Sequence, residues 1–595
     1  MTSFKKTVMS VAVTSSILLA ISCTSDEGQS YRIGKQNQVD RPLQIREEVG
    51  KLTTAESSTI ISADSGNTPL APQANIRLPP SVDQSHQLLD SAAMTIAPRP
   101  LLEQQIITQS EQYATLTDNP VVQTHLQPVS TFSIDVDTGS YSNIRRFLQN
   151  GQLPPIDAVR VEEMLNYFSY EYPDTASSEQ PFSVTTELGA TPWNNKTQLL
   201  HVGLKGYTPA KADDIPANLV FLIDVSGSMN SPDKLGLLKS SISMLAQELD
   251  SRDTVSIVVY AGSSGTVLPP TTGNNHHSIN RALAKLTAGG STNGAQGIEL
   301  AYQLAGENFT DGGVNRVILA TDGDFNVGLS DVNELKKLIE KKRESGIALT
   351  TLGFGKGNYN DHLMEQLADV GNGAYSYIDT LGEARKVLVD ELQATLLTIA
   401  KDVKIQVEFN PAVISEYRLI GYTNRKLANE DFNNDRVDAG EIGAGHTVTA
   451  LYEVALAGSG GELHSPLRYG NNEPVNTQQP LNNEVAEVRL RYKLPEVTES
   501  QLISTIVTVN DNERLIDSSS EIFRFSASVA AFGQLLRNNT RLDTFDYDDA
   551  RALAISSVGQ DKFGYRAEFI RLLDMASSLE RISRADTGQL QRNEG

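Results

Sequence analysis

The pattern of hydrophobic positions in this chain is organised around a continuous apolar run at residues 219–223. Asp224 follows this run directly. Short runs rich in Val, Leu and Ile are typical of strands that are buried on both faces of a parallel sheet. Between residues 215 and 398, similar runs alternate with segments in which apolar residues recur at helical spacing. Strands alternating with helices predict right-handed crossovers and a doubly wound, mostly parallel α/β sheet.

A different pattern flanks this region on both sides, with apolar and polar residues in alternation. Such alternation is typical of antiparallel strands that face water on one side, as in a sandwich. We therefore expect the α/β domain to be inserted into a β-sandwich built from residues 131–214, where helices precede the strands, and residues 399–520. Helical spacing in residues 521–595 predicts a helical C-terminal extension. The alternating segments are residues 182–191, 198–207, 403–409, 448–456 and 486–494.

The N-terminus has the pattern of a secretory signal over residues 1–22, with two lysines followed by an apolar stretch and then small residues. This stretch is too short for a membrane-spanning helix. Residues 19–23, Leu-Ala-Ile-Ser-Cys, resemble a bacterial lipobox, which implies that Cys23 is lipidated. The alternative is an incidental thiol, because a lone cysteine forms no intrachain disulfide. We expect an envelope protein anchored at its periplasmic face, and by analogy with bacterial sorting the outer membrane is favoured.

Composition limits the class of protein further. Residues 23–130 are rich in Ser, Thr, Gln and Pro and poor in aromatic side chains, which predicts a disordered tether. A net charge of −23 argues against nucleic acid as a partner and against electrostatic docking on an anionic bilayer.

Oxygen-bearing side chains follow the central strand in the pattern Asp224-x-Ser226-x-Ser228. Open α/β sheets bind ligands at the carboxyl ends of their strands, and a hard divalent cation is the ligand that such oxygens prefer. Together with Thr292 and Asp322, this motif resembles the metal-ion-dependent adhesion site of von Willebrand factor type A domains. The resemblance implies that four residues contact the metal directly: Asp224, Ser226, Ser228 and Thr292. It implies that Asp322 either contacts the metal or hydrogen-bonds to one of its ligands. The alternative is a polar loop that binds no metal.

The resemblance also implies a function. Hydroxyls are neutral, so three of them and two aspartates leave the metal electrophilic, with one position for an outside ligand. In the type A family that ligand is often a Glu or Asp of a partner protein. We expect cation-dependent protein–protein binding, with Mg²⁺ or Mn²⁺ somewhat better suited than Ca²⁺. From about residue 131 onward, the chain resembles bacterial lipoproteins typified by the YfbK family.

Two other functions remain open. One is a periplasmic scaffold with a structural metal, in which substitution of Asp224 would destabilise the fold. The other is a metal-assisted hydrolase, which we rank last because the sequence has no His-Glu-x-x-His motif, P-loop or Gly-x-Ser-x-Gly elbow. His276 and His277 are adjacent on a predicted loop, which is poor geometry for holding one ion together. We therefore expect no enzyme.

Two further acidic motifs were weighed as cation sites: Asp135 with Asp137, and Asp431 with Asn433 and Asp435. In the first, capping of a strand end is the favoured interpretation. The second has the alternating spacing of a calcium loop, but Arg436 replaces the sharp-turn glycine and Ile442 stands where a bidentate Glu is expected. A solvated acidic hairpin is therefore favoured there.

Overall fold

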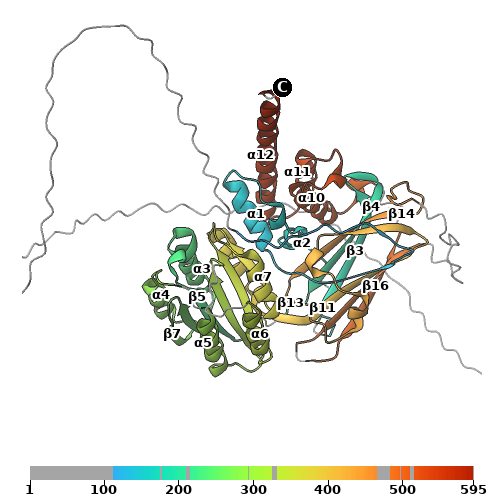
Figure 1. Cartoon of the computed structure of the whole chain (residues 1–595). Helices are drawn as coiled ribbons and strands as arrows, with labels where there is room; N and C mark the ends of the chain where they lie inside the picture. Colours follow the sequence, from blue (N-terminus) through green and yellow to red (C-terminus); the bar gives the residue numbers. More distant parts are fainter. Residues whose placement is uncertain are drawn as a thin grey trace, which may run out of the picture. The chain divides into compact units, whose positions relative to one another are not determined.

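Six strands form the central sheet of the computed structural model, in the order β10-β9-β8-β5-β6-β7. Figure 1 draws this domain in green to yellow and labels β5 and β7 of the sheet. Neighbours from β10 to β6 are parallel, and only β7 runs antiparallel to its neighbour. The doubly wound α/β sheet is therefore confirmed. The strands are β5 (Ala217–Asp224), β6 (Thr254–Tyr260), β7 (Ser264–Thr272), β8 (Val314–Thr321), β9 (Ala348–Phe354) and β10 (Tyr375–Ile378).

Helices cover both faces of this sheet, which explains the continuous apolar run in β5. All eight residues of β5 are buried. Leu219 and Phe221 join a core with α3, α4 and α8, whereas Val220 and Leu222 join a second core with α5, α6 and α7 on the opposite face. The helices are α3 (Leu237–Leu245), α4 (His276–Lys285), α5 (Gly294–Glu307), α6 (Val332–Arg343), α7 (Asp361–Val370), α8 (Leu381–Arg385) and α9 (Leu392–Leu396).

The flanking segments form two sheets that pack through a shared core. One has the order β1-β12-β14-β4-β3, and the other has the order β13-β11-β15-β16 with β2 paired to β11. Since β4 pairs with β14 across the intervening α/β domain, the predicted insertion is confirmed. The strands are β1 (Val122–Gln123), β2 (Val129–Ser133), β3 (Phe182–Thr191), β4 (Asn194–Gly206), β11 (Thr398–Phe409), β12 (Ile414–Ile420), β13 (Gly440–Gly443), β14 (Thr447–Leu456), β15 (Glu484–Lys493) and β16 (Gln501–Thr508).

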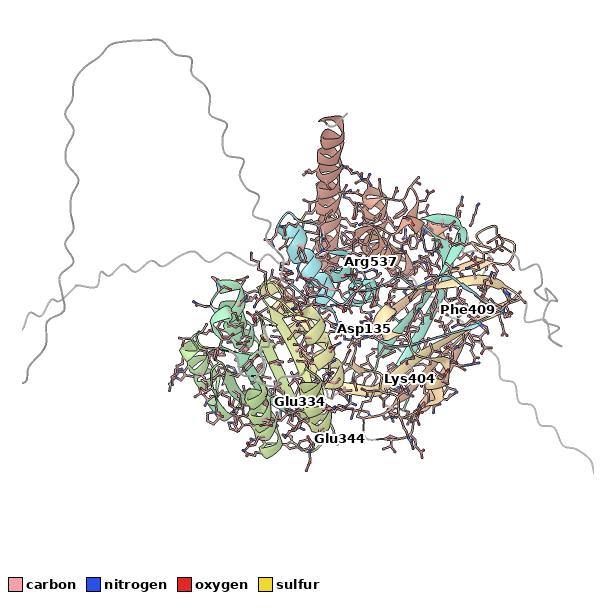
Figure 2. The ribbon with its side chains drawn as sticks, in the orientation of Figure 1. Asp135, Glu334, Glu344, Lys404, Phe409 and Arg537 are labelled. Carbon is pink, nitrogen blue, oxygen red and sulfur yellow. The ribbon has the colours of Figure 1, made fainter. Side chains whose placement is uncertain are left out.

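Aromatic side chains link these two sheets. Phe409 of β11, labelled in Figure 2, stacks on Tyr417 of β12 with ring centroids 4.3 Å apart. The same phenylalanine meets Tyr452 of β14 edge-on at 5.2 Å. Such ring pairs stabilise a core beyond the area that they bury, so they help to hold the sandwich closed.

The C-terminal helices share one core with the helices that precede the sandwich strands. Phe168, which follows α2, meets Phe525 of α10 edge-on with ring centroids 5.0 Å apart, and it meets Phe569 of α12 at 5.6 Å. The predicted extension is thus helical, and it completes a core begun near residue 139. The helices are α1 (Gly139–Gln149), α2 (Val161–Asn166), α10 (Glu521–Leu536), α11 (Tyr547–Ile555) and α12 (Tyr565–Asn593).

The structure describes residues 111–174, 177, 179–209, 215–291, 294–323, 332–465, 483–495, 497–509 and 515–593, with side chains of α12 up to residue 585. The signal, Cys23 and most of the expected tether lie outside this range. In the described part of the chain, no helix has the length and apolarity needed to cross a membrane.

Two expectations are corrected first. The tether was expected to reach residue 130, but β1 pairs with β12, and the buried Asn119 amide donates to the carbonyl oxygens of Leu419 and Gly421 at 2.9 and 2.7 Å. The segment is ordered by long-range hydrogen bonds, which leave no periodic signal. His276 and His277 begin α4 rather than lying in a loop, because Asn275 caps that helix.

The acidic loop at residues 431–435, whose spacing resembles that of a calcium loop, forms hydrogen bonds with arginine, lysine and serine side chains. Asp435 Oδ1 accepts from Arg491 at 3.0 Å and from the Ser500 hydroxyl at 2.7 Å. Lys404, labelled in Figure 2, donates to the carbonyl oxygens of Asp431 and Asn434 at 3.1 and 2.7 Å. Asp435 Oδ1, one of the expected calcium ligands, is thus engaged by protein donors. The segment is not the expected hairpin, because β12 and β13 on either side of it belong to different sheets; it is an acidic loop that contains the 3-10 helix Asn429–Asn433.

Candidate metal centre

The candidate metal residues lie where two adjacent parallel strands end. Asp224 is the last residue of β5, and Asp322 directly follows β8. Because β5 and β8 pair in parallel, with Ile223 opposite Ala320, their carboxyl ends reach the same edge of the sheet. Ser226 follows on a tight turn that continues as a short 3-10 helix over Gly227–Met229.

Asp224 is fully buried, and protein donors hold both of its carboxylate oxygens. Oδ1 accepts from the Ser226 amide at 2.8 Å, and Oδ2 accepts from the hydroxyls of Thr321 at 2.9 Å and Tyr260 at 3.3 Å. Burial raises the pKa of Asp224, the Ser226 and Thr321 donors oppose this rise, and the nearby charge of Asp322 adds to it. A buried carboxylate in fixed orientation is well suited to a cation that compensates its charge.

The two serine hydroxyls lie side by side. Ser226 Oγ and Ser228 Oγ are 3.0 Å apart, with Ser226 buried and Ser228 half-buried. Oxygen ligands about 2.1 Å from a Mg²⁺ ion occupy neighbouring corners of an octahedron when they are about 3.0 Å apart. The spacing and the chemistry of these donors therefore fit a small divalent cation.

The loop that carries Thr292 is tied to the serine turn through its backbone. The Gly227 amide donates to the Gly290 carbonyl at 3.1 Å, and the Gly289 amide donates to the Val225 carbonyl at 2.8 Å. Thr292 itself lies outside the described residues, as do residues 324–331 beyond Asp322.

Sequence reasoning missed one charged residue at this site. The Nζ of Lys234 lies 2.8 Å from Asp322 Oδ2, and both side chains are almost completely buried. Lys234 belongs to the π-helical turn Pro232–Gly236 that leads into α3. A signal was present, because Lys234 and the buried Leu238 and Ile242 fall on one helical face.

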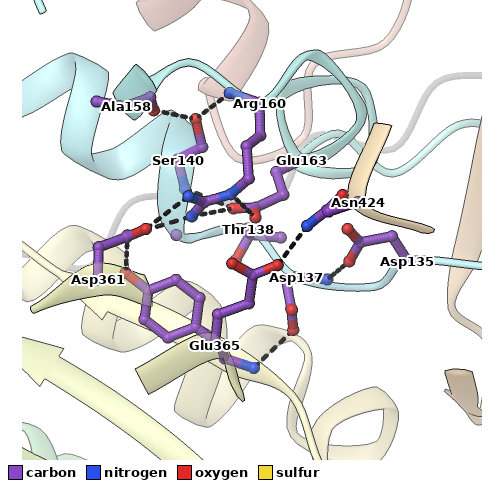
Figure 3. A network of polar contacts seen from close by, with 12 residues as sticks. Asp135, Asp137, Thr138, Ser140, Ala158, Arg160, Glu163, Asp361, Glu365 and Asn424 are labelled. Atoms are coloured by element: carbon purple, nitrogen blue, oxygen red, sulfur yellow. Dashed lines mark hydrogen bonds and ion pairs between the residues drawn. The ribbon is translucent and has the colours of Figure 1, made fainter. Parts of the chain in front are cut away.

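Other residues form a second cluster of carboxylates, in which oxygens of Asp135, Asp137 and Glu163 lie within 4.8 Å of one another (Figure 3). Each has a basic partner. Arg425 contacts Asp135 Oδ2 at 3.1 Å and Asp137 Oδ2 at 2.9 Å, and Arg160 forms a bidentate pair with Glu163.

Backbone donors use further oxygens of this cluster. Asp135 Oδ1 accepts from the Asp137 amide at 2.8 Å, and Asp137 Oδ1 accepts from the Tyr375 amide of β10 at 2.7 Å. The cluster is thus a buried ion-pair network in which the carboxylates cap backbone groups and bind arginine, in line with the favoured capping interpretation.

Comparison with known proteins gives the family. The model described as "von Willebrand factor type A domain" matches residues 218–393, and the models described as "von Willebrand factor" and "Uncharacterized protein YfbK, C-terminal" match residues 107–201 and 394–579. "Uncharacterized protein YfbK" of Escherichia coli (strain K12) is 47% identical to this chain over 479 residues, which are 79% of this chain and 82% of that relative. The chain belongs to the YfbK family.

Other relatives share shorter segments with this YfbK-family chain. Inter-alpha-trypsin inhibitor heavy chain H4 of Homo sapiens is 28% identical over 157 residues, 25% of this chain and 17% of that protein. Among solved structures, von Willebrand factor type A from Catenulispora acidiphila is 13% identical, with 66% of this chain and 91% of that chain covered and a TM-score of 0.36. The family assignment depends on neither of these two.

Proposed function

We propose that this YfbK-family protein binds a protein partner through a divalent cation held by Asp224, Ser226, Ser228, Thr292 and Asp322. The type A domain supports a role in protein–protein interaction or adhesion. The observation that carries the metal-dependent form is the pair of serine hydroxyls 3.0 Å apart beside the buried, oriented carboxylate of Asp224. The proposal assigns no catalytic step.

The chain's own residues have separate tasks in this proposal. The metal supplies a Lewis-acidic position that accepts a carboxylate of the partner. The hydroxyls of Tyr260 and Thr321 donate to Asp224 Oδ2 and thereby keep its carboxylate in one orientation when the partner binds. The neutral hydroxyls of Ser226 and Ser228 fix the ion without cancelling its charge, which keeps it attractive to an acidic side chain.

We extend the proposal to location. The lipobox pattern supports lipidation of Cys23, which would anchor the protein to the cell envelope at the periplasmic face, with the outer membrane favoured. Retention of [³H]palmitate label by the wild-type protein and its loss in Cys23→Ala would support this anchor. Equal labelling of the two would contradict it.

Metal binding is tested first by calorimetric titration of the purified protein with Mn²⁺. We expect saturable binding to the wild type and loss of binding in Asp224→Ala, with the circular dichroism of both proteins unchanged. The matched control is Asp311→Ala, which removes an exposed loop aspartate and should bind Mn²⁺ as the wild type does. Absence of binding by the wild type would overturn the proposal.

Water proton relaxation with bound Mn²⁺ separates an adhesion site from a structural metal. An ion with an open position keeps an exchanging water, so glutarate should lower the relaxation enhancement as its carboxylate displaces that water. A structural ion enclosed by protein ligands should show no response to glutarate. An Asp224→Ala protein that unfolds would likewise favour the scaffold over the adhesion function.

A further inference from the structure

Lys234 places a positive charge inside the site where the proposed function, on which this inference rests, requires a divalent cation. Its Nζ lies 2.8 Å from Asp322 Oδ2 and 3.4 Å from Asn358 Oδ1. The Lys234 side chain is 9% exposed and that of Asp322 is 1% exposed, so water screens this charge only weakly.

The absence of a side chain at Gly355 leaves room for the stem of this lysine. A Cβ atom on Gly355 would lie 2.3 Å from Cε and 2.4 Å from Cγ of Lys234, so only glycine leaves room for the lysine stem there. Gly355 also has φ +79°, in the left-handed region that glycine favours. Packing against Gly355 therefore holds the Lys234 side chain beside Asp322, unlike a lysine on the surface that is free to change rotamer.

The Lys234 ammonium and a divalent cation would compete for the carboxylate of Asp322, because their positive charges repel each other. Asp224 and Asp322 carry two negative charges, and Lys234 neutralises one of them. A divalent cation at Asp322 would then lie within a few ångströms of a buried like charge, which repels it strongly in a weakly polar interior. The same ammonium holds Asp322 in place while no metal is bound, because an unpaired buried carboxylate is costly.

We propose that Lys234 is a built-in competitor of the metal ion. Its ammonium pairs with Asp322 in the metal-free protein and must leave that oxygen when the cation binds. Lys234 thereby lowers the metal affinity and links occupancy of the site to the position of the turn Pro232–Gly236 and the start of α3. The site is thus set to respond to metal concentration rather than to stay saturated.

The test is Mn²⁺ calorimetry on Lys234→Met, which keeps the stem beside Gly355 and removes the charge. We expect its Mn²⁺ affinity to rise at least about tenfold over the wild type. Lys285→Met removes an equal charge from an exposed position on α4 and should leave the affinity unchanged. Lys234→Arg keeps the charge and should bind no more tightly than the wild type.

Thermal melting gives an independent measure. Without metal, Lys234→Met should melt below the wild type, because the buried Asp322 loses this ion pair. Saturating Mg²⁺ should raise the melting temperature of the variant more than that of the wild type. If Lys234→Met does not fold, Lys234→Gln serves in both measurements.

The outcomes separate this inference from the proposed function. Equal or weaker Mn²⁺ affinity in Lys234→Met, or in Lys234→Gln where it replaces that variant, overturns the competitor role and leaves the metal site standing. Absence of Mn²⁺ binding by the wild type overturns the metal site and the competitor role together. Tighter binding in Lys285→Met as well would assign the effect to net charge and would also overturn the role of Lys234.

Discussion

At the scale of single residues, the partners of a buried charged group decide whether it is a functional candidate or part of the structure. Asp224 and Asp322 both lie at one edge of the central sheet, where Asp224 accepts from the hydroxyls of Thr321 and Tyr260 and Asp322 forms an ion pair with Lys234. In the ion-pair network, by contrast, Arg425 alone contacts four carboxylates, those of Asp135, Asp137, Glu365 and Asp369. An arginine surrounded by acids has no position left for an outside ligand, so this network holds the fold together.

Glu365 of that network should make stability depend on pH. Burial raises its pKa from an ordinary 4.5 to about 7, although Arg160 and Arg425 oppose the shift. Between those pH values the folded protein keeps a proton that the unfolded chain has released, so stability falls as pH rises through this window. The slope from this one group is at most about 1.4 kcal/mol per pH unit.

Urea unfolding of Glu365→Gln between pH 4.5 and 7 measures this contribution. The variant should show a shallower decline of the unfolding free energy than the wild type. Glu334→Gln, on the exposed side of α6 (Figure 2), is the control and should follow the wild type. A Glu365→Gln profile parallel to the wild type would contradict the prediction.

At the scale of elements, the helices that follow the metal loops pack closely on the sheet. In α5, a Cβ on Gly297 would lie 2.9 Å from Cβ of Tyr260 and 3.1 Å from Cδ1 of Leu222. This glycine therefore sets how near α5 approaches β5 and β6. Because α5 begins at Gly294, two residues after Thr292, the position of α5 on the sheet also determines where the loop that carries Thr292 ends.

Gly297→Ala should therefore destabilise the protein by about 1–3 kcal/mol, the usual cost of overpacking a tight contact. Gly306→Ala is a matched control on the same helix, since the nearest atom to its Cβ is 4.0 Å away. That change should be neutral or stabilise by up to about 1 kcal/mol through helix propensity. Urea unfolding measures both, and an equal loss in the two variants would show that contact at Gly297 is not the cause.

At the scale of the whole described unit, buried charges and aromatic cores connect segments that are distant in the sequence. Arg425 follows β12 of the sandwich, Asp135 and Asp137 precede α1, and Asp369 lies on α7 of the inserted domain. One guanidinium thus joins the N-terminal segment, the α/β domain and the sandwich. Removal of its charge would leave several buried carboxylates without a partner.

Arg425→Met should accordingly cost about 3–5 kcal/mol of the unfolding free energy, as expected when one member of a buried ion pair is removed. Arg436→Met, in the exposed loop between β12 and β13, should change the unfolding free energy by no more than about 0.5 kcal/mol. Denaturant unfolding compares the two, and similar stability would argue that the network contributes little to holding the segments together.

Much of this molecule follows from local pattern. The sequence by itself predicts a buried parallel strand ending at Asp224, the helices on either side of its sheet, and alternating sandwich strands in both flanks, because periodicity reports which faces of an element are buried. It also brings Asp224, Ser226 and Ser228 together, since those residues share one turn. Their proximity needs no long-range contact.

Other features depend on which segments meet, and periodicity does not specify partners. Only the tertiary structure decided that β1 extends the sandwich, that β4 pairs with β14, and that Phe168 packs against the C-terminal helices. It also brought Lys234 to Asp322, 88 residues away along the chain. Such contacts form where the folded backbone places side chains in a common interior, so their energies come from burial and charge pairing that a linear pattern does not record.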